Sequence, residues 1–214
     1  MKIVALLYPQ MTLLDLVGPM QVWSFLPDIE IQFVWREKGP VPTDCGLPVV
    51  ATHDFSDAEA NPDVLFVGGG AYATIALLGQ PDVLAFVAAR GEKAQWVTSV
   101  CTGSLILGAA GLLRGYRAAC HWGAREQLEN FGAIRSDGRV CIDRNRLSGG
   151  GITSGIDFGL TVAGHWAGED VGKTLELIME YAPEPPFGTG RPELADPATR
   201  ERAAALLAAA MAPA

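Results

Sequence analysis

Positive charge is scarce in this sequence, and no segment concentrates it. Only 19% of the 214 residues are charged, and 16 basic residues stand against 24 acidic ones for a net charge of −8. Binding to nucleic-acid phosphates needs clustered lysine and arginine, so we do not expect nucleic acid as a partner. Hydrophobic residues make up 49% of the chain, which excludes a mainly disordered protein and favours one globular domain.

Long hydrophobic runs are missing as well. No apolar stretch approaches the roughly 20 residues that a membrane-spanning helix needs, so we expect no membrane association. The apolar residues near the start have no small-residue cleavage site after them. They therefore favour a first core strand over a signal peptide and predict a cytoplasmic protein.

Cysteine and histidine are few, and both are scattered. The cysteines form no Cys-x-x-Cys pair, and free thiols are the expectation in a reducing compartment. The histidines are too far apart to indicate a metal site. These residues are Cys45, Cys101, Cys120 and Cys141, and His53, His121 and His165.

What the sequence does contain is an alternation of short apolar runs with helical patterns. The alternation predicts an α/β domain with a mostly parallel sheet covered on both faces. Residues 39–55, rich in proline and glycine, predict a hairpin or irregular excursion. Strand-like runs cover residues 2–8, 29–37, 63–67, 95–100, 116–120 and 140–147, and helical patterns cover part of 71–90, then 102–113, 153–166 and 171–181.

Proline marks two further boundaries. Because a proline in a helix interior removes a hydrogen bond, we expect a loop that ends at Gly18, with Pro19 in the first turn of a helix reaching about Leu26. A second proline-rich stretch follows Tyr181. We therefore expect the domain over residues 1–187, and over 188–214 a proline-rich exit and an Ala-rich helix that packs on the domain or on a partner subunit.

Cys101 is the strongest candidate for chemistry. It lies between the predicted strand 95–100 and a helix, and Gly103 and Ser104 follow it closely. A side chain at such a turn stands at the carboxyl edge of the sheet, where open α/β folds place their sites. The adjoining helix N-terminus favours an anion, which predicts a lowered pKa for the thiol. The alternative is a buried structural cysteine.

Asp15 follows the first strand and should reach the same edge of the sheet. A carboxyl group beside a thiolate would have a raised pKa and could donate a proton. Thr12-x-x-Asp15 equally resembles a helix capping box, so a structural role stays open. The triplets Gly68–Gly70 and Gly149–Gly151 end strands, where they present amides for an anion or form ordinary turns. His121 follows a predicted strand, and a structural role is the simpler interpretation for it.

Several of these pieces together resemble the ThiJ/PfpI superfamily. They are Asp15-Leu-Val-Gly18-Pro19, the glycine triplet after Val67, Ser99-Val-Cys101-Thr-Gly-Ser, and Ser148-Gly-Gly-Gly-Ile-Thr-Ser-Gly-Ile-Asp157. Within that group the chain is similar to the branch that hydrates isocyanides, in Val100-Cys101-Thr102-Gly103, His121-Trp122, Asp143-Arg-Asn-Arg146 and Tyr181-Ala-Pro-Glu-Pro-Pro-Phe187. The resemblance implies a flavodoxin-like three-layer α/β/α sandwich with a cysteine nucleophile elbow.

The same resemblance implies a function and a set of site residues. Members of that branch are homodimers that add water to an isocyanide and release an N-substituted formamide, with no metal or organic cofactor. Carried over to this chain, Cys101 is the nucleophile and Asp15 the acid beside it. The backbone amides of Gly70 and Thr102 and the segment from Gly150 to Ile152 would line the pocket.

Two other functions stay open at this point. Thr102 stands where other branches of the superfamily carry a histidine after the cysteine, which argues against a Cys-His protease or glutamine amidotransferase. A glyoxalase or deglycase acting on small dicarbonyls would also need a thiolate and a nearby carboxyl group. A third reading is a small-molecule or redox sensor, because related domains serve as the sensor half of transcription regulators and a reactive cysteine is easily oxidised.

Overall fold

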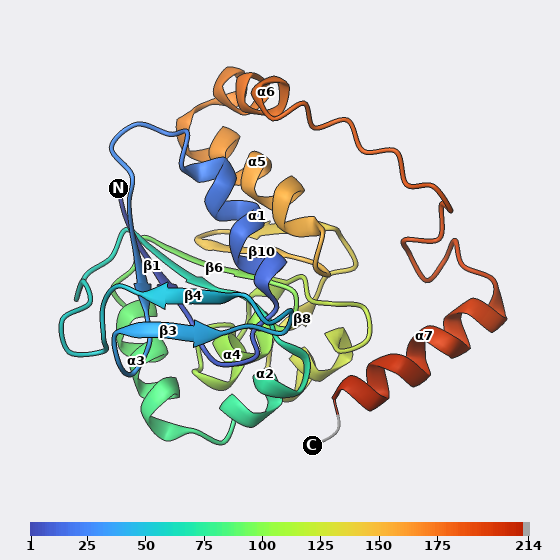
Figure 1. The fold of residues 1–214 in the computed structure, drawn as a ribbon, viewed down its shortest axis with the longest axis horizontal. Helices are drawn as coiled ribbons and strands as arrows, with labels where there is room; N and C mark the ends of the chain where they lie inside the picture. Colours follow the sequence, from blue (N-terminus) through green and yellow to red (C-terminus); the bar gives the residue numbers. More distant parts are fainter. Residues whose placement is uncertain (212–214) are drawn as a thin grey trace.

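The computed structural model describes residues 1–211. A six-stranded sheet lies at their centre, with helices on both sides of it (Figure 1). Neighbouring strands run parallel, except that β10 pairs antiparallel with β9 at one edge. In spatial order the strands are β2 (Glu30–Val34), β1 (Lys2–Leu6), β5 (Val64–Val67), β6 (Trp96–Val100), β10 (Arg146–Gly149) and β9 (Val140–Asp143). The mostly parallel sheet that the sequence predicted is confirmed.

The middle strands are apolar because helices cover both of their faces. All four residues of β5 are buried, as are the last four of β1 and of β6. One face carries α1 (Leu13–Trp23) and α5 (Ser154–Ala167), and α6 (Glu169–Ile178) packs on α5. The other face carries α2 (Ala71–Leu77), α3 (Pro81–Gly91), α4 (Gly103–Ala109) and the 3₁₀ helix η1 (Arg125–Phe131). The result is the predicted three-layer sandwich.

The prediction for residues 12–26 was wrong. Helix α1 begins at Leu13 and ends at Trp23, so Pro19 lies inside it rather than in its first turn. An interior proline costs about 3 kcal/mol, and tertiary packing offsets that cost here. The side chains of Val22 and Trp23 are fully buried, and α1 crosses α5 closely at glycines, so that a Cβ atom at Gly159 would lie 3.0 Å from Pro19 Cα.

Two other elements differ from their predicted bounds by more than the rest. Helix α4 ends at Ala109 and does not reach residue 113, because Gly111 takes a left-handed conformation with a φ of 81°. The run 140–147 is not one strand. It contains most of the hairpin β9–β10, whose turn places Arg144 at a φ of 55°.

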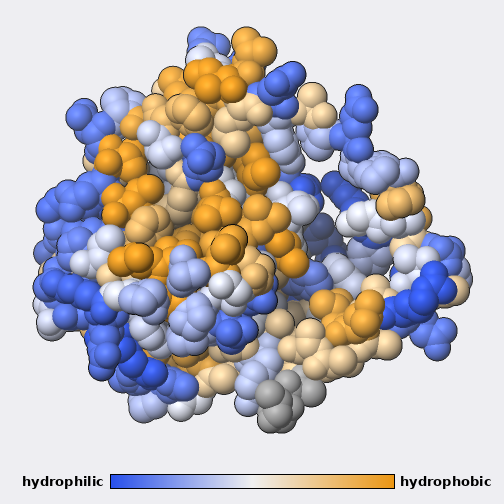
Figure 2. Space-filling view, in the orientation of Figure 1, coloured by the Kyte–Doolittle hydropathy of each residue, from blue (hydrophilic) through white to orange (hydrophobic). Residues whose placement is uncertain are grey.

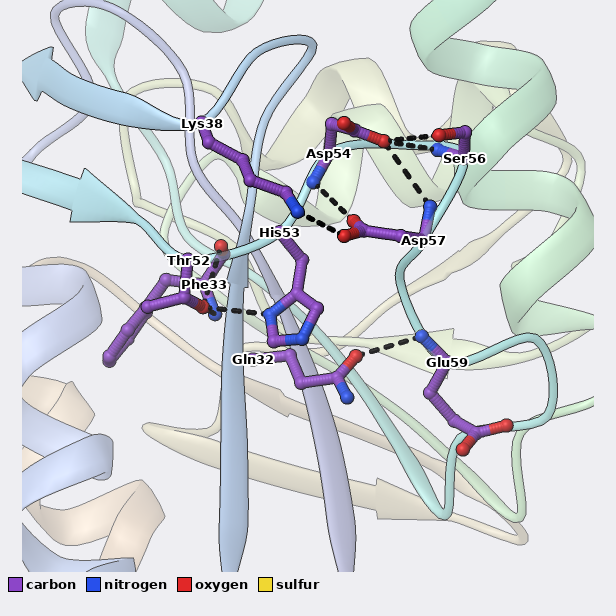
Figure 3. Close-up of polar contacts among 9 residues, drawn as sticks. All are labelled: Gln32, Phe33, Lys38, Thr52, His53, Asp54, Ser56, Asp57 and Glu59. Carbon is purple, nitrogen blue, oxygen red and sulfur yellow. Dashed lines mark hydrogen bonds and ion pairs between the residues drawn. The ribbon is translucent and has the colours of Figure 1, made fainter.

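Small elements extend the edges of the domain. The segment 39–55 contains the hairpin β3 (Gly39–Pro42) and β4 (Pro48–Ala51), as expected, and β7 (Arg117–Ala118) pairs with β8 (Ile134–Arg135). Beyond β4, His53 Nδ1 lies 2.9 Å from Thr52 Oγ1, and the Glu59 amide donates to Gln32 Oε1 at 2.8 Å (Figure 3). These contacts tie the segment to β2, and they place His53 in a structural setting.

The chain leaves the domain after α6 in an extended, exposed segment and ends in α7 (Pro197–Ala210), on the side of the molecule where α2 lies (Figure 1). Residues 182–211 are called the C-terminal arm below. Helix α7 has no buried residue. No single described helix is both long and apolar enough to cross a membrane, although α2 and α3 together, bent by 88°, meet that length and composition test.

Candidate active site

Cys101 lies at the strand-to-helix turn that the sequence predicted. Strand β6 ends at Val100 and α4 begins at Gly103, and Cys101 between them has a φ of 60°, a strained conformation for a residue with a side chain. Its amide donates to the carbonyls of Gly149 at 3.1 Å and Gly150 at 2.8 Å. A Cβ atom at Gly103 would overlap the carbonyl oxygen of Val67. The turn is therefore held by backbone contacts and by the absence of a side chain at 103.

The electrostatic prediction for this thiol was wrong in sign. Burial raises the pKa of the Cys101 thiol well above its usual value, and the nearby Asp15 charge raises it further. The amides of Thr102 and Ile152 interact with the sulfur and lower the pKa, but by less. Helix α4 is only seven residues long, and the thiol is 5% exposed. Loss of hydration therefore outweighs the helix dipole.

Asp15 lies beside this thiol, fully buried on α1. Its Oδ2 accepts a hydrogen bond of 2.8 Å from the Gly69 amide, and its Oδ1 is buried without a partner of hydrogen-bond geometry among residues 1–211. Burial raises the pKa of the carboxyl from 3.8 to about 7, against the lowering effects of the Gly69 amide and of Cys101. The Asp15 amide donates to the Thr12 carbonyl at 3.1 Å, but the Thr12 side chain makes no capping bond. The capping-box reading is therefore wrong.

The first glycine triplet brings α1, β5 and the turn at Cys101 together. A Cβ atom at Gly69 would lie 2.6 Å from the Thr102 amide nitrogen and 2.9 Å from Asp15 Oδ2. Only glycine fits between those two groups without displacing one of them. The Gly70 amide donates to Thr102 Oγ1 at 3.2 Å. Gly70 therefore supports Thr102, whose own amide faces the sulfur of Cys101.

Two buried residues near the site have no signal in the sequence. Thr102 Oγ1 lies 2.8 Å from Thr74 Oγ1, and Tyr8 Oη lies 3.2 Å from the same Thr74 oxygen. Tyr8 also donates to the Gly68 carbonyl at 2.8 Å. This network fixes the side chain of Thr102, which follows Cys101. Tyr8 follows the first strand and Thr74 lies in α2, and neither position is part of a recognisable motif.

The second glycine triplet forms the loop on the other side of Cys101. The Gly150 carbonyl accepts from the Cys101 amide, while the Gly150 amide is engaged with the Arg139 carbonyl at 2.8 Å. Next to this loop is a cleft of about 580 Å³, lined by residues 120–122 and 150–153 and by 190–194 of the C-terminal arm, among others. Cys101 is not among the residues that line it. His121 is, and burial lowers the pKa of its imidazole.

Among the described residues no three histidine, cysteine, aspartate or glutamate side chains are grouped so that they could hold a metal ion. His53 and His165 lie outside the site, and His165 packs edge-on against Trp96 with ring centroids 5.2 Å apart. All four cysteines are free thiols in the structure.

A buried cysteine in a strained turn after a central parallel strand, with a carboxyl of raised pKa beside it, defines the class of α/β proteins with a cysteine elbow. Residues 1–164 match the DJ-1/PfpI family. The chain belongs to that family.

Three relatives show the range of the match. An isonitrile hydratase of Pseudomonas putida is 44% identical over 198 residues, covering 92% of this chain and 86% of that protein. The crystal structure of a ThiJ/PfpI family protein from Pseudomonas syringae superposes with a TM-score of 0.95 at 42% identity, covering 98% of this chain and 87% of the other. An HTH-type transcriptional regulator of Pseudomonas aeruginosa is 32% identical over 98 residues, which are 45% of this chain and 27% of the regulator.

Proposed function

We propose that this protein is an enzyme that adds water to an isocyanide and releases an N-substituted formamide. The observation that carries the proposal is the pair formed by Cys101 and Asp15, a buried thiol beside a carboxyl with a pKa of about 7. A thiol and a proton donor are what this reaction needs. Identity of 44% over nearly the full length of an isonitrile hydratase supports the choice of substrate.

In the first half of the reaction the thiolate of Cys101 attacks the isocyanide carbon. A carbon–sulfur bond forms, and Asp15 gives its proton to the same carbon, which produces a thioimidate and leaves Asp15 as a carboxylate. Ionisation of Asp15 raises the pKa of Cys101, so the thiolate is favoured only while Asp15 keeps its proton. The amides of Thr102 and Ile152 stabilise the negative sulfur before the attack.

In the second half water adds to the carbon of the thioimidate. The Asp15 carboxylate takes one proton from the water and passes it to the substrate nitrogen, so that a tetrahedral intermediate forms on sulfur. The carbon–sulfur bond then breaks, the hydroxyl proton returns to Asp15, and the formamide leaves. The thiolate and the carboxylic acid are both regenerated. The net reaction converts one isocyanide and one water into one N-substituted formamide.

The alternatives have less support. Dicarbonyl chemistry by a glyoxalase or deglycase would use the same two residues, but the relative that matches along most of the chain is named for isonitrile hydration. A sensor role rests on the regulator, whose match covers under half of this chain.

The proposal includes a homodimer in the cytoplasm. Apolar side chains lie exposed on α1, namely Leu14 and Val17, and Phe25 is exposed just after the helix; Figure 2 shows hydrophobic residues over and beside this helix. Such a surface supports self-association. Free thiols fit a reducing compartment. Light scattering on the purified chain tests the dimer, and a monomer mass would refute it.

The test of the reaction is formamide production from para-nitrophenyl isocyanide. We expect turnover by the wild type, none by Cys101→Ala, and a loss of at least roughly 100-fold in Asp15→Asn, the usual contribution of general acid–base catalysis. Cys141→Ala is the matched control, because Cys141 is a buried thiol in β9 outside the site, and it should keep full activity. No turnover by the wild type would refute the proposed reaction.

A further inference from the structure

The cleft beside the glycine loop lies where the far end of a Cys101-bound substrate would extend. Its lining includes Gly150 and Ile152. The Gly150 carbonyl accepts a hydrogen bond from the Cys101 amide, and the Ile152 amide interacts with the sulfur of Cys101. The nucleophile itself lies behind this loop, 5% exposed. The cleft therefore begins at two residues that contact Cys101, and it is the space available to the substituent on the isocyanide nitrogen.

His121 is a lining residue of this cleft, and its imidazole has one hydrogen-bond donor whose position is fixed. The Gly123 amide donates to His121 Nδ1 at 3.2 Å. Because Nδ1 is the acceptor, the neutral ring must carry its proton on Nε2. Burial lowers the pKa of the imidazole, which keeps the ring neutral. Nε2 makes no hydrogen bond within the part of the chain that the structure describes.

The backbone next to His121 leaves room for the ring. A Cβ atom at Gly151 would lie 2.6 Å from His121 Cδ2 and 3.3 Å from Nε2. The absence of a side chain at 151 thus lets the imidazole lie directly against the glycine loop. The neighbouring Trp122 also lines the cleft, and the two ring centroids are 5.7 Å apart. A flat, aromatic substituent matches such a wall.

The charged side chains of the cleft indicate what kind of acceptor fits. Arg125 is paired with Asp137 at 3.1 Å, and Arg139 is paired with Asp157 at 2.6 Å. Both of these guanidinium groups are paired within the protein, and the third arginine of the lining, Arg191, is matched by the acidic Glu193 of the same lining, so the cleft has no excess of positive charge to attract an anionic substituent. A neutral oxygen acceptor opposite His121 Nε2 is the better match, since a neutral donor and a neutral acceptor form an ordinary hydrogen bond.

We infer that His121 is a specificity-determining residue, and that the enzyme selects aryl isocyanides whose ring carries a neutral hydrogen-bond acceptor such as a carbonyl group. The inference rests on the proposed function and names its substrate class. His121 binds the substituent and takes no part in the bond changes at Cys101.

The test compares 4-acetylphenyl isocyanide with 4-isopropenylphenyl isocyanide, which has the same shape but no acceptor. For each enzyme the ratio of the two kcat/KM values is measured, and ratios are compared between variants so that the intrinsic reactivity of the substrates cancels. His121→Phe keeps an aromatic ring against Gly151 and removes the donor. His165→Phe is the matched control, because His165 lies outside the cleft.

We expect His121→Phe to lower this ratio roughly 3- to 10-fold, the value of one hydrogen bond, mainly through the KM of the acetyl substrate. His165→Phe should leave it unchanged. An unchanged ratio in His121→Phe would overturn the inference.

Calorimetric binding of the two product formamides separates this result from a failure of the reaction itself. If the wild type hydrates neither isocyanide, the proposed function fails. A wild-type preference for the acetyl formamide that His121→Phe abolishes would still support the acceptor site. Equal affinities in both proteins would overturn it.

Discussion

At the scale of single residues, Asp15 and Cys101 share protons as one unit. Burial raises the pKa of both groups, the Asp15 charge raises the pKa of Cys101 further, and the hydrogen bond from Cys101 lowers the pKa of Asp15, so the two groups titrate together. With a pKa of about 7 for the Asp15 carboxyl, the pair holds two protons below about pH 7 and one proton above it. Only the singly protonated pair contains the form with a thiolate and a carboxylic acid.

The pH dependence of kcat/KM follows from this coupling. Because the active form appears when the first proton leaves, kcat/KM of the wild type should rise with pH through about 7 and then level off, as the raised pKa of Asp15 requires. In Asp15→Asn the buried thiol must ionise alone, so the rising limb should move to higher pH. Steady-state kinetics measure both profiles. A range from about pH 5 to about pH 10 covers the ordinary pKa of a thiol as well as that of Asp15.

The control for this pH profile is Asp170→Asn, since Asp170 is an exposed carboxyl group on α6. Its profile should match that of the wild type. A wild-type limb that stays in place when Asp15 is replaced would show that another group controls the reaction.

The positions of both residues and the raised pKa of Asp15 could be predicted from the sequence, but the direction of the Cys101 pKa shift could not. The carboxyl ends of parallel strands meet at one edge of the sheet. A cysteine between a strand and a helix and an aspartate after the first strand are therefore expected at the same edge. The sign of the Cys101 shift depends on how completely the thiol loses its hydration, which is a property of packing. The support from Tyr8 and Thr74 depends on contacts between distant segments for the same reason.

At the scale of elements, the crossing of α1 and α5 sets the position of Asp15. The two helices approach so closely that a Cβ atom at Gly159 would lie 2.9 Å from Val22 Cγ2 and 3.0 Å from Pro19 Cα. Glycine at 159 therefore lets α1 lie against α5 at the turn that follows Asp15. The interior proline of α1 belongs to the same contact.

Gly159→Ala should separate the two helices. We expect it to lower the free energy of unfolding by about 1–3 kcal/mol, the usual cost of overpacking, and to lower kcat/KM because Asp15 moves away from Cys101. Gly164→Ala in the same helix is the matched control. Its Cβ atom would meet nothing nearer than 3.7 Å, and a helix gains up to about 1 kcal/mol from this change. Urea denaturation measures both, and equal stabilities would contradict the role of the close crossing.

Element types could be predicted from the sequence better than their ends. The buried strands were clear because apolar runs such as Val64–Val67 occur where both faces are covered. The start of α1 was missed because the local cost of Pro19 was weighed without its packing on α5. The β9–β10 hairpin was missed because Arg144 takes the positive-φ position of its turn, where glycine or asparagine is the usual signal.

At the scale of the whole molecule, the C-terminal arm forms one side of the cleft, and the domain forms the other. Residues 190–194 form part of its wall. Farther along, Leu207 Cδ1 lies 3.0 Å from where a Cβ atom at Gly123 would be, next to the histidine that faces the cleft. The arm contributes little to the core, since α7 buries no residue. Residues 1–187 therefore contain the sheet and every helix that covers it.

Removing residues 188–214 should leave a folded protein with an open cleft. The core does not depend on α7, so we expect little change in the urea midpoint. The KM for para-nitrophenyl isocyanide should rise roughly 10-fold, about 1.4 kcal/mol of lost binding, while kcat changes less because Cys101 and Asp15 lie outside the arm.

A pair of point variants separates the contact from the length of the chain. Leu207→Ser should raise KM in the same direction, because Leu207 packs at Gly123. The neighbouring Leu206 is 72% exposed, so Leu206→Ser should leave KM unchanged. A KM that stays the same after truncation would show that the arm is not a wall of the working cleft. Loss of the folded state on truncation would instead make the arm part of the domain, and the boundary at residue 187 would then be wrong.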